Sequence, residues 1–185
     1  MDRINIGLIG LGTVGTGLVK ILQENGKVLE KRLGLPMVLK RVADQDVTRD
    51  RGIKINPALL TTQVSEIIDD REISIVVELI GGLEPARTFL LQAIGRGKNV
   101  VTANKALLAV HGAEIFKAAD EAGVDLGFEG SVGGGIPIIR SLKEGLVANQ
   151  IQVLFGILNG TSNYILTEME RRGCSFHDRR GLHLA

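Results

Sequence analysis

Short apolar runs alternate with amphipathic segments along most of this chain. Five runs rich in Ile, Val and Leu predict buried strands, over residues 4–9, 37–43, 73–80, 99–102 and 124–128. Apolar positions at helical spacing predict helices over residues 13–30, 64–70, 85–96 and 111–121. The polar stretch 49–62 contains Pro57 and predicts an irregular connection. This alternation predicts an α/β fold, with a parallel sheet covered by helices on both faces.

The pattern changes at residue 129. A glycine cluster over 130–135 precedes a predicted helix, 136–146, a predicted strand, 150–155, and a predicted helix, 161–171. We therefore place a domain boundary within 128–135, between a first domain, 1–128, and a second segment, 129–185. The second segment is short for an independent core, so it either packs on the first domain or is incomplete.

Composition excludes several classes of protein. The 22 basic and 21 acidic residues give a net charge of +1, and the chain has no Trp and one Tyr. Neither a basic face nor aromatic stacking platforms for nucleic acid are therefore indicated. No apolar stretch is long enough to span a membrane, and the start lacks the features of a signal peptide. The single cysteine, Cys174, cannot form an internal disulfide, and we expect a cytoplasmic protein.

A glycine-rich loop carries the first candidate chemistry. Residues 10–15, Gly10-Leu11-Gly12-Thr13-Val14-Gly15, match G-x-G-x-x-G between a predicted strand and a predicted helix. In this context the first glycine permits a tight turn, the second lets a pyrophosphate approach the backbone, and the third lets helix and strand pack closely. The free N–H groups at the helix start would receive the anion. The alternative is a glycine-rich turn without a ligand.

Two further positions border this loop in the predicted sheet. Asp44 ends the second predicted strand, where a carboxylate hydrogen-bonds the adenine ribose and favours NAD over NADP. Nearby arginines could instead bind a 2′-phosphate, and Asp44 could be a solvated turn residue; these arginines are Arg41, Arg49 and Arg51. Gly81 and Gly82 end the strand at the expected switch point, where they either approach the cofactor or form a plain turn.

Three more segments, together with the glycine loop, resemble homoserine dehydrogenases. They are TANKALL at 102–108, EGSVGGGIP at 129–137 and GILNGTSNYIL at 156–166, and the resemblance runs from about residue 3 to about residue 176. It implies a Rossmann-like cofactor domain followed by an α+β catalytic and dimerisation domain. It also implies NAD(P)-dependent interconversion of L-homoserine and L-aspartate 4-semialdehyde, a step in threonine, methionine and isoleucine biosynthesis. For the full-length family it implies a homodimer.

The resemblance also implies roles for individual residues. Lys105 matches a lysine beside the nicotinamide and the substrate oxygen, where an ammonium stabilises and protonates a developing alkoxide. Gly160 and Thr161 match residues near the substrate, although Thr161 is also a good helix N-cap. A sodium site is implied at Glu129, Val132, Gly134 and Ile136. For Lys105 the alternative is a surface lysine, and for Glu129 it is a cap on the following helix.

The chain departs from this family towards its C-terminus. The resemblance implies further acidic substrate ligands and a second catalytic lysine after residue 176, whereas residues 178–185 do not match the family's next helix. We therefore expect a truncated start of the catalytic domain and little activity from these 185 residues alone. The alternative function is a non-catalytic nucleotide-binding remnant of the family.

Overall fold

The computed structural model describes residues 2–156 and 160–173 of the chain. Its internal packing divides into two units, Met1–Ser141 and Leu142–Ala185, and each is described by itself. The first unit contains the whole sheet and the first five α-helices. The predicted domain boundary within 128–135 stays a prediction.

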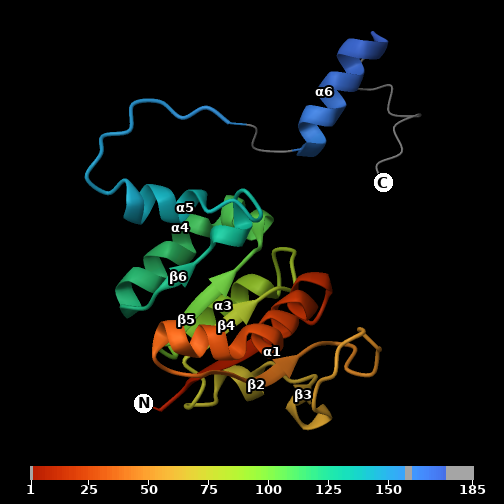
Figure 1. The fold of residues 1–185 in the computed structure, drawn as a ribbon, viewed down its shortest axis with the longest axis vertical. Coiled ribbons are helices and arrows are strands. Elements are labelled where there is room, and N and C mark those ends of the chain that lie inside the picture. Colours follow the sequence, from red (N-terminus) through yellow and green to blue (C-terminus); the bar gives the residue numbers. More distant parts are fainter. Residues whose placement is uncertain (1, 157–159, 174–185) are drawn as a thin grey trace. The chain divides into compact units, whose positions relative to one another are not determined.

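The first unit is built on a parallel sheet of six strands in the order β3-β2-β1-β4-β5-β6 (Figure 1). The strands are β1 (Ile4–Ile9), β2 (Met37–Ala43), β3 (Leu60–Thr61), β4 (Ile75–Glu78), β5 (Asn99–Thr102) and β6 (Leu126–Gly127). All five predicted strands of this unit are confirmed. The short strand β3 was missed, because only two residues of the polar connection pair with β2. From β1 the sheet extends through β2 to β3 on one side, and from β4 it extends through β5 to β6 on the other. The switch point of the sheet therefore lies between β1 and β4.

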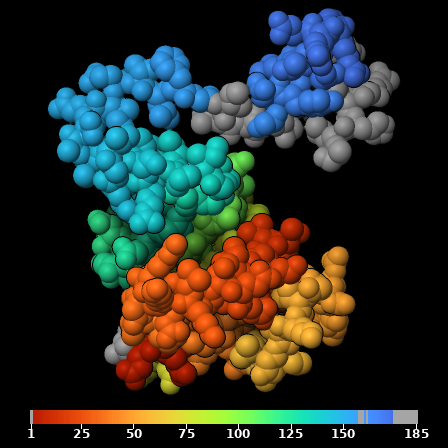
Figure 2. Space-filling model, in the orientation of Figure 1, coloured from red at the N-terminus to blue at the C-terminus, as the bar shows by residue number. Residues whose placement is uncertain are grey.

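Helices cover both faces of the sheet, as predicted. Helix α1 (Thr13–Leu33) packs on one face against a core that includes Leu8, Val19 and Val77. In Figure 1 this helix crosses the sheet on the side towards the viewer. In Figure 2 it forms much of the orange-red surface in front of the sheet. The other core joins strand residues to helices α2 (Ser65–Ile68), α3 (Ala86–Gly95) and α4 (Lys105–Ala122).

The ends of the two long helices follow from their flanking residues. Both stop at a glycine in the left-handed conformation, Gly34 after α1 and Gly123 after α4. Helix α4 begins at Lys105 rather than at the predicted residue 111, because the side-chain oxygen of Asn104 accepts the N–H of Leu107 and caps the helix. The asparagine in TANKALL was the signal for this earlier start.

The chain after β6 is less regular. A 3₁₀ turn, Glu129–Ser131, leads to α5 (Ile138–Arg140) and a π-helical turn, Ser141–Gly145, so the predicted helix 136–146 is helical over 138–145. The predicted strand 150–155 is wrong, since residues 150–156 form no strand. A strand needs a neighbour for its backbone hydrogen bonds, and the described chain offers none here. Helix α6 (Gly160–Arg172) confirms the predicted helix 161–171.

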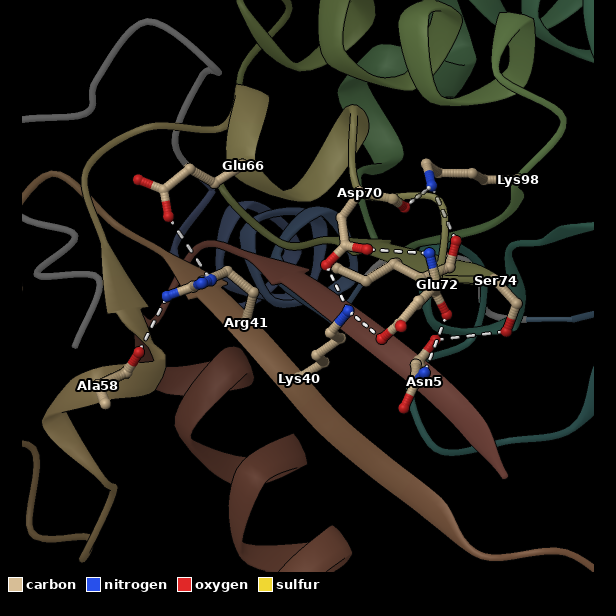
Figure 3. Close-up of polar contacts among 10 residues, drawn as sticks. Asn5, Lys40, Arg41, Ala58, Glu66, Asp70, Glu72, Ser74 and Lys98 are labelled. Atoms are coloured by element: carbon tan, nitrogen blue, oxygen red, sulfur yellow. Dashed lines mark hydrogen bonds and ion pairs between the residues drawn. The ribbon is translucent and has the colours of Figure 1, made fainter. Parts of the chain in front are cut away.

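A polar cluster joins the loop before β4 to the amino-terminal side of the sheet (Figure 3). Lys40 on β2 forms ion pairs with Asp70 at 2.7 Å and Glu72 at 2.6 Å. Buried Lys98 donates to the carbonyl oxygens of Asp70 and Ile73 at 2.6 and 2.8 Å, and burial lowers the pKa of its ammonium. The cluster fixes the loop that leads into the central strand β4.

Among the described helices, none is long and apolar enough to cross a membrane.

Candidate functional site

The glycine-rich loop forms the tight link between β1 and α1 that the motif predicts. Gly10 has φ +101°, a conformation that favours glycine, and a Cβ there would lie 2.7 Å from the carbonyl carbon of Leu79. A Cβ on Gly15 would overlap the carbonyl oxygen of Gly10. Gly10 therefore lets the loop pass beside β4, and Gly15 lets the helix pack on the loop.

Gly12 differs from these two glycines because it faces open space. It is the N-cap residue of α1, and no atom lies within 4 Å of the position that its Cβ would occupy. No side chain caps this helix start, and its first turn contains no acidic residue. The N–H groups of the first turn are therefore available to an anion. The residues present fit the pyrophosphate of a dinucleotide, which is the ligand that the motif predicts.

Asp44 lies at the carboxyl end of β2, as predicted, and its carboxylate contacts the glycine loop directly. It accepts the N–H of Leu11 at 2.6 Å, the N–H of Asp46 at 2.9 Å and the Nη2 of Arg51 at 2.9 Å. These contacts hold the loop against β2. Of the nearby arginines, Arg51 pairs with Asp44, whereas Arg41 donates to the carbonyl oxygen of Ala58 at 2.9 Å. A carboxylate retains acceptor sites beyond three donors, so contact with a ribose hydroxyl stays a prediction.

The ends of β4 and β5 hold a buried carboxylate that sequence reasoning missed. Glu78 is 0% exposed and accepts the N–H groups of Ile80 and Gly81, at 2.8 and 3.2 Å, and the hydroxyl of Thr102, at 2.7 Å. The signal was an acidic residue inside an apolar, β-branched run, three positions before the first of two glycines. Gly81 and Gly82 both have positive φ, so the loop after Glu78 turns in a way that favours glycine.

Lys105 begins α4 at the carboxyl end of β5 and is exposed. The preceding residue, Asn104, is buried and fixed by its own hydrogen bonds, including one from its Nδ2 to the carbonyl oxygen of Gly82 at 2.7 Å. The structure therefore brings the start of α4 close to the Gly81–Gly82 turn. This is the edge of the sheet at which parallel α/β folds bind ligands.

Glu129 has the capping role that the sequence left open. Its two carboxylate oxygens accept the N–H groups of Ile139 and Arg140, each at 2.9 Å. Ser131 anchors the same segment, donating from its hydroxyl to the carbonyl oxygen of Thr102 at 2.9 Å. The carbonyl of Ile136 accepts the N–H of Ile138 at 2.8 Å. Val132, Gly134 and Ile136 lie between the 3₁₀ turn Glu129–Ser131 and α5, and coordination of a cation by their carbonyls stays a prediction.

The predicted substrate residues lie in the second unit. Gly160 is the first residue of α6 and is exposed, whereas the side chain of Thr161 and residues 157–159 lie outside what the structure describes.

A surface groove of about 710 Å³ lies between segments 62–69 and 89–96, and it includes none of the predicted site residues. The candidate site is therefore the carboxyl edge of the sheet around the glycine loop.

Comparison with known proteins decides the family. The model of the homoserine dehydrogenase NAD-binding domain matches residues 10–129, and the homoserine dehydrogenase model matches residues 137–179. The chain belongs to the homoserine dehydrogenase family. The first match covers the glycine loop, Glu78 and Lys105, so the candidate site lies within the part of the chain that matches the NAD-binding domain.

Individual homoserine dehydrogenases agree with this assignment. The Bacillus subtilis enzyme is 46% identical over 169 residues, which are 91% of this chain and 39% of that protein. The Synechocystis enzyme is 48% identical over 176 residues, 95% of this chain and 40% of that protein. A crystal structure of the Thiobacillus denitrificans enzyme has a TM-score of 0.84 at 50% identity and covers 96% of this chain and 41% of its own.

A more distant relative bears on the fold alone. A hyperthermophilic archaeal homoserine dehydrogenase solved in complex with NADPH has a TM-score of 0.69 at 24% identity, with 94% of this chain and 58% of its own covered. The chain spans about two fifths of the Bacillus and Synechocystis homoserine dehydrogenases. For this chain, the activity of those whole proteins is therefore a proposal.

Proposed function

We propose that this chain binds NAD or NADP at the carboxyl edge of its sheet and serves the interconversion of L-homoserine and L-aspartate 4-semialdehyde. The observation that carries the proposal is the Gly10–Gly15 loop, which leaves an uncapped helix start and open space at Gly12 beside the switch point. Membership of the homoserine dehydrogenase family supports the choice of reaction.

In this proposal, different residues of the site lie against different parts of the dinucleotide. Backbone N–H groups of Gly12, Thr13 and Val14 at the start of α1 bind the pyrophosphate. Asp44, with Leu11 held against it, faces the adenosine half, and Gly81 lies towards the nicotinamide half. Because Asp44 carries a negative charge where a 2′-phosphate would lie, we expect NAD to bind more tightly than NADP.

Lys105 is the proposed catalytic residue. When bound, a reduced nicotinamide supplies a hydride to the aldehyde carbon of the semialdehyde. The ammonium of Lys105 stabilises the negative charge that develops on the aldehyde oxygen and donates the proton that completes the alcohol. In the proposal Gly160 and Thr161 bind polar groups of the amino acid substrate.

The family resemblance adds further parts to the proposal. Each oxygen of Glu129 uses one acceptor site on a backbone N–H, which leaves capacity for a sodium ion together with the carbonyls of Val132, Gly134 and Ile136. A homodimer in the cytoplasm is proposed on the same basis. A sodium-dependent rise in the unfolding temperature, absent with choline chloride at equal ionic strength, tests the cation site.

Binding and turnover test the proposal separately. NADH and NADPH are titrated into the 185-residue chain by fluorescence, and tighter binding of NADPH would overturn the role given to Asp44. Oxidation of the bound cofactor by L-aspartate 4-semialdehyde is then followed at 340 nm. Binding without turnover favours a nucleotide-binding unit, whereas turnover of about 1–10³ per second shows that these residues suffice for the reaction.

Lys105→Met separates the two halves of the proposal. We expect NADH affinity within about twofold of the unsubstituted chain, because the pyrophosphate contacts that dominate binding remain. Any semialdehyde reduction that the unsubstituted chain supports should fall by about 10²-fold or more, the usual contribution of a general acid. An unchanged rate in Lys105→Met would assign the proton donor to another group.

A further inference from the structure

A closed ring of hydrogen bonds joins the ends of β4 and β5. Glu78 accepts from Gly81 N–H at 3.2 Å on one side and from the Thr102 hydroxyl at 2.7 Å on the other. The Thr102 oxygen in turn accepts the N–H of Asn104 at 3.0 Å. Asn104 closes the ring through its Nδ2, which donates to the carbonyl oxygen of Gly82 at 2.7 Å.

The three side chains of the ring are buried, and the ring connects two segments of the chain, 78–82 and 102–104. Glu78, Thr102 and Asn104 are 0%, 1% and 7% exposed. The ring fixes the Gly81–Gly82 turn relative to the first residue of α4, Lys105, because Asn104 is the N-cap of that helix. A buried carboxylate that receives three hydrogen bonds is a rigid support, and losing one partner leaves a buried polar group unsatisfied.

The position of the ring in the sheet identifies which part of a dinucleotide it borders. In a sheet of this order the pyrophosphate lies at the β1–α1 loop and the adenosine half extends towards the end of β2. The nicotinamide half therefore extends the other way, over the ends of β4 and β5. The ring lies at these two strand ends, directly beneath that half of the crevice.

We propose that Glu78 is a positioning residue, whose carboxylate holds the Gly81–Gly82 turn and the start of α4 in the arrangement that receives the nicotinamide half of the cofactor. The proposal rests on the proposed cofactor binding and adds a specific support to it. Glu78 acts through Gly81, Gly82 and Lys105 rather than by touching the cofactor.

The test compares a whole cofactor with a fragment that lacks nicotinamide. NADH and ADP-ribose are titrated into the unsubstituted chain, Glu78→Gln and Thr102→Val. Both variants should bind NADH about tenfold more weakly, the effect of one lost hydrogen bond to a charged group, while ADP-ribose affinity changes less than about twofold. A general loss of structure would weaken both ligands equally.

A second threonine supplies the matched control. Thr61, at the end of β3, donates its hydroxyl to Glu66 at 2.8 Å and accepts the N–H of Gln63 at 3.0 Å, the same pattern as Thr102. Thr61→Val should leave the ratio of NADH to ADP-ribose affinity unchanged. Thr102→Ser keeps the hydroxyl and should restore NADH binding, which gives a readout even if Thr102→Val fails to fold.

The outcomes separate this inference from the function on which it rests. An unsubstituted chain that binds neither ligand overturns the proposed cofactor site itself. Normal binding by the unsubstituted chain with an equal loss of both ligands in Glu78→Gln overturns only the positioning role. A weakened NADH affinity in Thr102→Ser, or in Thr61→Val to the same degree as in Thr102→Val, also overturns it.

Discussion

At the scale of single residues, the glycines of one loop have different physical reasons to be glycine. A Cβ on Gly15 would overlap the carbonyl oxygen of Gly10, whereas a Cβ on Gly12 would meet no atom within 4 Å. We therefore expect Gly15→Ala to lower the free energy of unfolding by about 1–3 kcal/mol, the usual cost of overpacking. Gly12→Ala should change it by less than about 0.5 kcal/mol, as expected away from packed contacts. Urea denaturation measures both, and equal effects would contradict this division.

The residues of the loop could be predicted from sequence because the G-x-G-x-x-G spacing encodes backbone geometry. Asp44 was located correctly, but its contacts with Leu11 and Arg51 could not be foreseen, because they depend on how the loop after β2 folds back. Glu78 was missed for a related reason. A buried carboxylate looks unfavourable until its donors are known, and its donor Thr102 lies on another strand.

At the scale of elements, the N-cap of α4 offers a direct test of local stability. Asn104 accepts the N–H of Leu107 at 3.1 Å. Asn104→Ala should lower the free energy of unfolding by about 0.5–2 kcal/mol, the range measured for lost N-caps. Asn104→Ser retains an oxygen that can cap the helix and should recover part of this loss. An alanine variant as stable as the original would show that the cap contributes nothing.

The ion pairs of Lys40 give the loop before β4 a pH-dependent stability. Burial raises the pKa of Asp70, but the hydrogen bond from Lys40 outweighs it with other contacts, so the pKa lies below its usual value. A carboxyl whose pKa is lower in the folded state stabilises the protein above its unfolded pKa, about 4, and loses this contribution as the pH falls through its folded pKa.

Lys40→Met should therefore cost about 0.5–1 kcal/mol of unfolding free energy at pH 7, as for a partly exposed ion pair. The difference between Lys40→Met and the original chain should shrink as the pH falls from about 4 through the lowered folded-state pKa of Asp70, because the carboxylate of the ion pair is then lost. Urea denaturation at pH 7 and at pH 3 measures it. A difference that is unchanged at pH 3 would show that Lys40 stabilises the loop through packing rather than charge.

Elements were predictable where their own pattern decides them and were missed where distant partners do. The strands over 4–9, 37–43 and 99–102 have the bounds that their apolar runs predict. The apolar run 150–155 carries an equally strong strand pattern, yet it pairs with nothing in the described chain. Strand formation depends on a neighbour, which a local pattern does not encode.

At the scale of the whole molecule, the apolar run 150–155, which pairs with no described strand, predicts self-association. Val153, Leu154 and Phe155 are 63%, 59% and 91% exposed. Consecutive exposed apolar side chains favour contact with another apolar surface. We expect the unsubstituted chain to associate with rising concentration in sedimentation velocity and the double variant Val153→Ser/Phe155→Ser to associate less. Val110→Ser, at a position 62% exposed on α4, is the control and should behave like the original chain.

The central claim is that the open loop at Gly12 receives the pyrophosphate of a dinucleotide. Isothermal titration calorimetry of NADH into the unsubstituted chain and into Gly12→Val tests it most directly, with unfolding temperatures recorded for both. The account predicts saturable binding by the unsubstituted chain. It predicts no binding by Gly12→Val at an unchanged unfolding temperature, because a side chain there enters the space of the ligand and its Cβ has no protein atom within 4 Å. Equal NADH affinity in the two proteins would contradict the account.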